Sequence, residues 1–96
     1  MLRTTICLLF FATPVMAQDK AELCQVSSDI AGAAVAERQD GQAANSAVTA
    51  IAANLPDEQS AYEAAVQPIV EWVYTLPEEQ LGDEVASSYK TACLEQ

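Results

Sequence analysis

Apolar residues recur along most of this chain at intervals of three and four, the spacing that places side chains on one face of an α-helix. The pattern first holds over residues 19–39, with apolar positions at Leu23, Val26, Ile30, Ala31, Ala34 and Val35. Asp19, followed by Glu22, is suited to capping the start of this helix, and Gly41 is suited to ending it. We therefore expect a first helix over residues 19–39.

Two further segments repeat this periodicity. A shorter helix is expected over residues 43–54, closed by Asn54 and Pro56, with an apolar face made of Ala44, Val48, Ile51, Ala52 and Leu55. A longer helix is expected over residues 57–75, with a buried stripe at Tyr62, Val66, Ile69, Val73 and Leu76. Pro68 lacks a backbone donor and must kink or break this helix. Because the stripe stays in phase across Pro68, we expect a kink.

The last periodic segment starts between Pro77 and Asp83 and runs to about Leu94, with apolar positions at Leu81, Val85, Tyr89 and Ala92. Alanine is abundant and alternating β-branched runs are absent, which favours helix throughout. The pattern predicts an all-α fold with a single domain over residues 18–96. We expect a small four-helix bundle closed by one disulfide.

The first residues differ in character from the rest. One positive charge, Arg3, precedes an apolar run from Ile6 to Ala12, which is about half the length needed to span a bilayer. Pro14 interrupts the segment, and the small residue Ala17 precedes the expected cut. This pattern is typical of a secretory signal peptide over residues 1–17, and an uncleaved anchor helix is the alternative. It predicts a periplasmic or secreted protein with no stable membrane anchor after cleavage.

Two cysteines follow the expected cut, Cys24 and Cys93, near opposite ends of the domain. An even number of cysteines in an exported protein favours a disulfide between them. In the chain-entropy account, closing a loop of about 70 residues stabilises a domain by about 4 kcal/mol. Two free thiols, or a bond between two chains, are the alternatives.

Beyond residue 17 the chain carries three basic residues against fourteen acidic ones, a net charge of −11 near neutral pH. The basic residues are Lys20, Arg38 and Lys90. Such a surface repels nucleic acid and anionic membranes. It favours a basic partner, although solubility alone also accounts for it.

The residues offer little for catalysis. The chain has no histidine, which excludes histidine-based nucleophilic arrangements, and two cysteines alone do not complete a zinc site. The densest carboxylate pairs are Glu78-Glu79 and Asp83-Glu84. Both fall at a predicted helix start, where acids interact favourably with the helix dipole. We therefore expect no enzyme activity, no cofactor and no metal.

Three side chains are candidates for an interaction surface: Trp72, Tyr74 and Arg38. Trp72 stands at the edge of the third apolar stripe, so it is either a half-buried core aromatic or the anchor of a binding surface. The core position is the interpretation we favour. We expect Arg38 to pair with a carboxylate such as Asp40 or one on a neighbouring helix, with ligand binding as the alternative.

One set of spaced residues spans the domain, made of Cys24, Arg38, Gly41, Ile69-Val70-Glu71-Trp72-Val73-Tyr74, Pro77, Tyr89 and Cys93. In this layout the chain resembles small exported proteins of proteobacteria with no known activity. The resemblance implies a periplasmic location and a single disulfide. Acid-activated periplasmic chaperones are similar in size, helical content and disulfide count. Helical periplasmic immunity proteins of type VI secretion look similar between Trp72 and Cys93, although they usually carry further cysteines.

These observations support three hypotheses of function. The first is a protein-interaction module that binds another envelope protein. The second is a holdase chaperone switched by acid, in which the carboxylates neutralise together, loosen the bundle and expose its apolar stripes. The third is a secretion-system immunity protein. A hydrolase built on carboxylates is the least supported, and the partner and oligomeric state stay open.

Overall fold

The structure is a computed structural model that describes the backbone of residues 7–96 and the side chains of residues 19–96. These residues form four α-helices, α1 (Cys7–Gln39), α2 (Ala44–Asn54), α3 (Glu63–Thr75) and α4 (Asp83–Leu94). Two short 3₁₀ helices, η2 (Asp57–Tyr62) and η3 (Glu78–Gln80), precede α3 and α4. The described part contains no strand, so the predicted all-α four-helix fold is confirmed.

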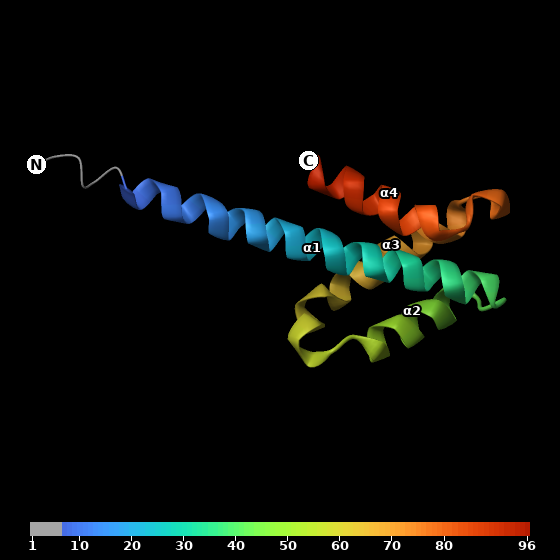
Figure 1. The fold of residues 1–96 in the computed structure, drawn as a ribbon. Helices are drawn as coiled ribbons and strands as arrows, with labels where there is room; N and C mark the ends of the chain where they lie inside the picture. Colours follow the sequence, from blue (N-terminus) through green and yellow to red (C-terminus); the bar gives the residue numbers. More distant parts are fainter. Residues whose placement is uncertain (1–6) are drawn as a thin grey trace, which may run out of the picture.

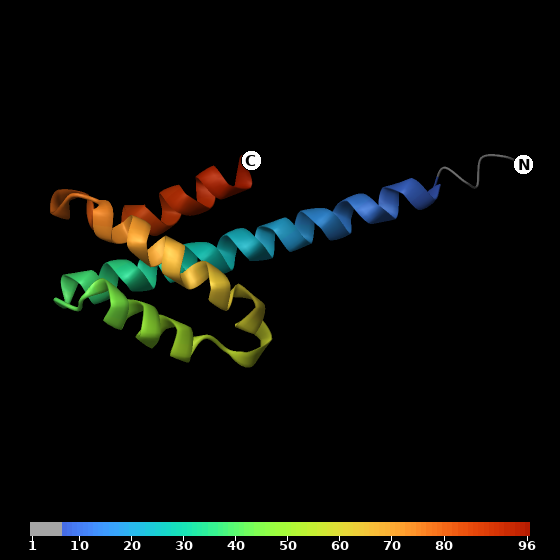
Figure 2. The same ribbon diagram turned by 180° about the vertical axis from the view of Figure 1, so that it is seen from behind.

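Helix α1 is the centre of the bundle. It contacts each of the other three α-helices, and α3 also packs on α2. Figures 1 and 2 show α4 and α2 on opposite sides of α1, with α3 crossing it on a third side. The first part of α1 projects beyond the other helices (Figure 1). The shorter helices are therefore arranged around α1.

Helix α1 begins well before the predicted start. It is continuous from Cys7, so Asp19 lies inside it and the predicted cap at Asp19 is wrong for this chain. The residues before Asp19 include leucines and alanines, which extend a helix readily once it has formed. The basic start of the predicted signal peptide, residues 1–6, lies outside the described residues. None of the described helices is long and apolar enough to cross a membrane.

The end of α1 follows the prediction. Gly41 adopts a positive φ of 87°, a conformation that favours glycine. The backbone N–H of Gln42 donates to the carbonyl of Glu37, and that of Gly41 to the carbonyl of Arg38, both at 3.0 Å. This pair of bonds is the Schellman arrangement, which satisfies carbonyls that the helix itself leaves free.

The core is built mainly from alanine, valine and isoleucine. Its buried members are Val26, Ile30, Ala31, Ala34, Val35, Ala47, Ile51, Val66, Ile69, Val70, Val73 and Val85. Most predicted stripe positions are buried or pack against this cluster. Leu23, which is 44% exposed, Ala52 and Ala92 are exceptions, whereas Val70 is fully buried although the predicted stripe omitted it.

The third predicted helix is divided in two. Residues 57–62 are wound as 3₁₀ helix and the α-helix begins only at Glu63, which is common at helix N-termini. Pro68 lies inside α3, and the helix continues through it. A break at Pro68 is thereby excluded, and the kink stays a prediction. Gln67 and Glu71 are exposed on the face opposite the stripe.

Cys24 and Cys93 form a disulfide, as predicted, with 5.6 Å between their Cα atoms. The bond joins α1 to the last turn of α4. Polar contacts accompany it, because Lys20 Nζ donates to the main-chain oxygen of Gln96 and Lys90 Nζ donates to Gln25 Oε1 at 2.6 Å. Covalent and polar links therefore hold α4 against α1 at this end of the bundle.

Candidate interaction groove

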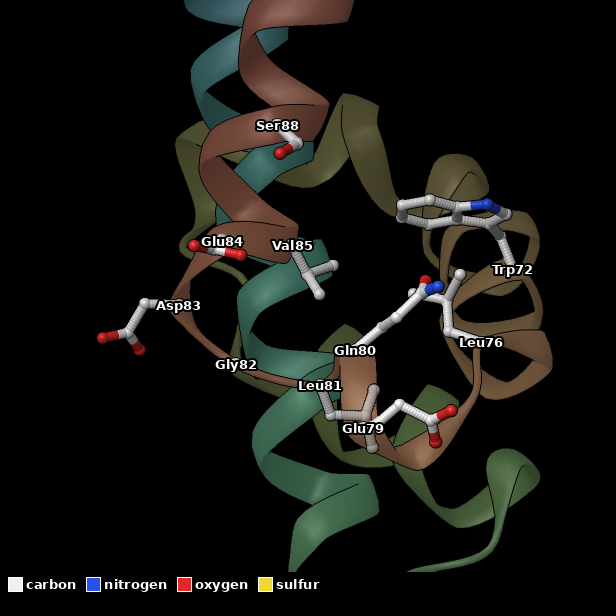
Figure 3. A pocket seen from close by; sticks show the side chains of 10 residues that line it. All are labelled: Trp72, Leu76, Glu79, Gln80, Leu81, Gly82, Asp83, Glu84, Val85 and Ser88. Atoms are coloured by element: carbon white, nitrogen blue, oxygen red, sulfur yellow. The ribbon is translucent and has the colours of Figure 1, made fainter.

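An open groove lies where the chain turns from α3 into α4. We call it the α3–α4 groove, and it is lined by Trp72, Leu76, Glu79, Gln80, Leu81, Gly82, Asp83, Glu84, Val85 and Ser88. Its volume is about 630 Å³. Figure 3 shows Trp72 and Leu76 on one side of the opening and Val85 and Ser88 on the other, with Gln80 extending between them.

Proline and glycine set the shape of this turn. Helix α3 ends at Thr75, and Pro77 follows with extended backbone (ψ 148°) before the 3₁₀ turn of η3. Proline cannot continue the hydrogen-bond ladder of the preceding helix. Gly82 then adopts extended backbone and stands at the N-cap position of α4. The connection therefore folds back compactly, and its own side chains line the groove.

Trp72 forms the aromatic edge of the groove. Its side chain is 41% exposed, so the core position that we favoured is wrong. The ring lies 5.7 Å from that of Tyr89 on α4, with the planes tilted by 53°. Tilted aromatic pairs of this kind contribute about 0.5–1.5 kcal/mol beyond area burial. Tyr89 thus contacts one part of the indole, while another part stays open to solvent.

Acidic side chains surround the apolar part of the groove. Glu79 stands in the first turn of η3, and Asp83 and Glu84 stand in the first turn of α4. These are the helix-start positions that the sequence predicted for them, where negative charge is favourable. In Figure 3 the Asp83 side chain points outward from the rim, while Glu79 borders the opening near Leu81. The groove thus combines apolar surface with carboxylates.

Tyr74 and Arg38 belong to a different place in the bundle. The Tyr74 hydroxyl donates to the carbonyl of Gln42 at 2.6 Å, and the Arg38 guanidinium lies 5.8 Å over the Tyr74 ring. Arg38 Nη1 also donates to the carbonyls of Val73 and Leu76. The structure therefore brings Arg38 and Tyr74 together with each other but pairs Trp72 with Tyr89.

The predicted pairing of Arg38 with a carboxylate such as Asp40 is wrong. Asp40 follows Arg38 by two residues, and side chains two apart do not face each other on a helix. The free carbonyls at the end of α3 offer the guanidinium better partners. Burial raises the pKa of Tyr74, and the Glu37 carboxylate raises it further, while Arg38 opposes them.

Lys20 and Lys90, the other cations among the residues whose side chains the structure describes, make similar contacts. Within the described residues, the hydrogen bonds of Lys20, Arg38 and Lys90 run to main-chain oxygens and to the Gln25 side-chain amide rather than to Asp or Glu side chains. The same part of the chain holds no group of three or more residues suited to binding a metal ion. The groove carboxylates thus receive no hydrogen bond from these three cations.

Comparisons with protein-family models, with curated proteins and with solved structures gave no match. The groove must therefore be interpreted from its own residues. Sequence reasoning singled out Trp72 but missed Tyr89 as its partner and Leu81 and Val85 as neighbours across the opening. The signal was present in the short Pro77–Gly82 connection, which forces the end of α3 and the start of α4 together.

Proposed function

We propose that this protein is a small acidic interaction module of the cell envelope, which binds another envelope protein through the Trp72 edge of the α3–α4 groove. The observation that carries the proposal is the exposure of Trp72. Tryptophan is enriched among the residues that dominate protein–protein binding. Here the chain's single tryptophan is 41% exposed beside an open groove.

The setting of Trp72 suits a binding anchor. The residue lies on α3, whose opposite face is fixed in the core by Val66, Val70 and Val73. Tyr89 supports the indole from α4. A side chain held in this way loses less conformational freedom on binding than a mobile one, which favours affinity.

Two features support an envelope location. The N-terminal pattern over residues 1–17 is that of a secretory signal. The Cys24–Cys93 disulfide is of a kind that persists in oxidising compartments and is rare in reducing ones. We propose that cleavage after Ala17 leaves residues 18–96 as the working protein, in the periplasm or outside the cell.

The test is cross-linking and affinity capture of the tagged protein from its native envelope. Trp72→Ala should abolish recovery of a specific partner. Leu94→Ala is the matched control, because Leu94 is also a large exposed apolar residue, at 43%, but does not line the groove. Equal recovery with both variants would overturn the proposal. A secretion-system toxin as the captured partner would identify the protein as an immunity protein.

Acid-responsive holdase activity is the competing function. Its mechanism requires contacts that protonation destroys, yet the three cations beyond residue 17 bond to main-chain and amide oxygens. Protonation instead reduces repulsion among the carboxylates. We therefore expect a native near-ultraviolet circular dichroism signal and no dye binding at about pH 3. Loss of that signal together with suppression of client aggregation would favour the chaperone.

A further inference from the structure

The α3–α4 groove offers two kinds of attraction to one ligand. Its apolar part is formed by Leu76, Leu81 and Val85, and its aromatic edge by Trp72. Glu79 and Glu84 line the same opening and are both exposed to solvent. A ligand that fits must place an apolar group on the floor and a positive charge near the carboxylates.

None of the basic residues beyond position 17 donates a hydrogen bond to the carboxylates of the groove. Lys20 and Lys90 bond at the disulfide end of the bundle. Arg38 bonds to the last carbonyls of α3. With fourteen acidic residues in the chain, a cation for this groove must be sought in a partner.

Arginine matches the groove better than lysine. A guanidinium is planar, stacks on an indole face, and binds carboxylates through paired N–H groups. Lysine carries a compact, strongly hydrated charge that makes neither contact as well. Trp72, Glu79 and Glu84 line the same groove. In Figure 3 the two carboxylates stand apart from the indole, so the exposed glutamate side chains must turn toward the opening to meet a guanidinium stacked on Trp72.

We propose that the α3–α4 groove binds a segment of the partner protein in which an arginine stands next to an apolar residue. The guanidinium stacks on Trp72 and pairs with Glu79 or Glu84, and the apolar neighbour covers Leu81 and Val85. This inference rests on the proposed function and specifies the partner's chemistry. Nucleic acid is not the occupant, since its phosphates would be repelled by the same carboxylates.

Trp72 is also the reporter for the test. Because it is the chain's single tryptophan, its fluorescence reports directly on the groove. The probe is a capped pentapeptide in which two arginines flank a leucine, compared with peptides carrying two lysines or two glutamates in their place. We expect saturable change with the arginine peptide, binding at least about threefold weaker with lysine, and no change with glutamate.

Paired variants separate the groove from the overall charge. Glu79→Gln with Glu84→Gln removes two charges from the groove. Glu58→Gln with Glu63→Gln removes two charges elsewhere, and each pair takes one residue from the first turn of a 3₁₀ helix and one from that of an α-helix. We expect about tenfold weaker arginine-peptide binding for the groove pair and less than about twofold for the control pair.

Each outcome decides the inference. Raising the salt concentration from about 50 to about 300 mM should weaken binding to the unaltered protein. Equal losses in both pairs, no loss in either, or equal binding of arginine and lysine peptides would overturn it. Circular dichroism confirms that each variant is folded before titration.

If envelope capture depends on Trp72 while the arginine peptide does not bind, this inference fails and the proposed function stands. If the peptide binds but Trp72→Ala leaves capture unchanged, the proposed function fails.

Discussion

Arg38, in the last turn of α1, donates a 2.9 Å hydrogen bond to the carbonyl oxygen of Val73 near the end of α3. A second bond from the same nitrogen reaches the carbonyl of Leu76. Carbonyls at a helix C-terminus lack intrahelical donors, and positive charge is favourable there. One side chain of α1 therefore caps the end of another helix.

Replacing Arg38 should destabilise the bundle. We expect Arg38→Ala to lower the free energy of unfolding by about 1.5–3 kcal/mol, the range for hydrogen bonds to a charged group. Arg38→Lys should recover part of the loss. The neighbouring exposed residue is the control, and Gln39→Ala should cost less than about 0.5 kcal/mol. Urea titrations measure all three, and equal effects at positions 38 and 39 would show that the cap contributes nothing.

We expect alkaline pH to destabilise the folded protein through ionisation of Tyr74. Its pKa is raised from 10.0 in the folded protein by burial first and by Glu37 second. A raised pKa means that the native state holds the proton more tightly than the unfolded chain does. The resulting stabilisation is present below the unfolded pKa and is lost as pH rises through the folded one.

The midpoint temperatures of thermal unfolding of the unaltered protein and of the Tyr74→Phe variant should therefore converge as pH increases. Tyr74→Phe removes the bond to Gln42, which is 2.6 Å long, and should cost about 0.5–1.5 kcal/mol at neutral pH. Above about pH 10 the unaltered protein should lose stability more steeply than the variant. Parallel curves through this range would show that Tyr74 ionises equally in both states.

The division of α3 into a buried and an exposed face predicts which of its residues contribute to stability. Ile69→Ala should lower the free energy of unfolding by about 2–4 kcal/mol, since it empties a buried site. Glu71→Ala should change it by less than about 0.5 kcal/mol, because Glu71 is exposed and its hydrogen bond from Gln67 is also at the surface. Chemical denaturation of both variants is the measurement. Comparable losses at the two positions would be incompatible with the observed burial.

The disulfide should supply much of the stability of so small a domain. Cys93→Ser should cost about 2–5 kcal/mol, the usual loss in small exported domains. Peptide mapping without reduction should recover the Cys24–Cys93 pair from the native protein. Two thiols open to alkylation in that protein would contradict the link.

The mass of the exported protein tests whether residues 1–17 are cleaved. The N-terminal pattern predicts that the exported protein begins at Gln18. Intact-mass measurement of protein recovered from the envelope should give a chain of residues 18–96. A species that keeps residues 1–17 would argue for the uncleaved anchor instead.

The sequence predicted the fold because its helices carry strong local signals. Gly41 ended α1 where expected, and the spacing of Val66, Ile69 and Val73 placed them in the core. The start of α1 was missed because Pro14 indicates the end of a helix and Asp19 the start of another. In the structure these two signals are outweighed by the good helix formers on both sides of them. Val70 was missed because α3 is covered by α1 on one side and α2 on another, which widens its buried face beyond a single stripe.

The groove was harder to predict than the core. Periodicity assigns each residue to a face of its own helix but does not say which neighbouring helix meets that face. Trp72 could be recognised as a candidate, whereas its contact with Tyr89 depends on the angle at which α4 returns after Gly82. Arg38 was misassigned for the same reason, since its backbone partners lie 35 and 38 residues away.

The position of the Cys24–Cys93 bond has a mechanical consequence. The bond links two residues 69 positions apart, so α2, α3 and most of α4 lie within the closed loop. A force pulling the chain ends apart passes from α1 directly through the sulfur–sulfur bond into the last residues. The helices inside the loop carry no load, and the groove between α3 and α4 would keep its shape while the protein is under tension.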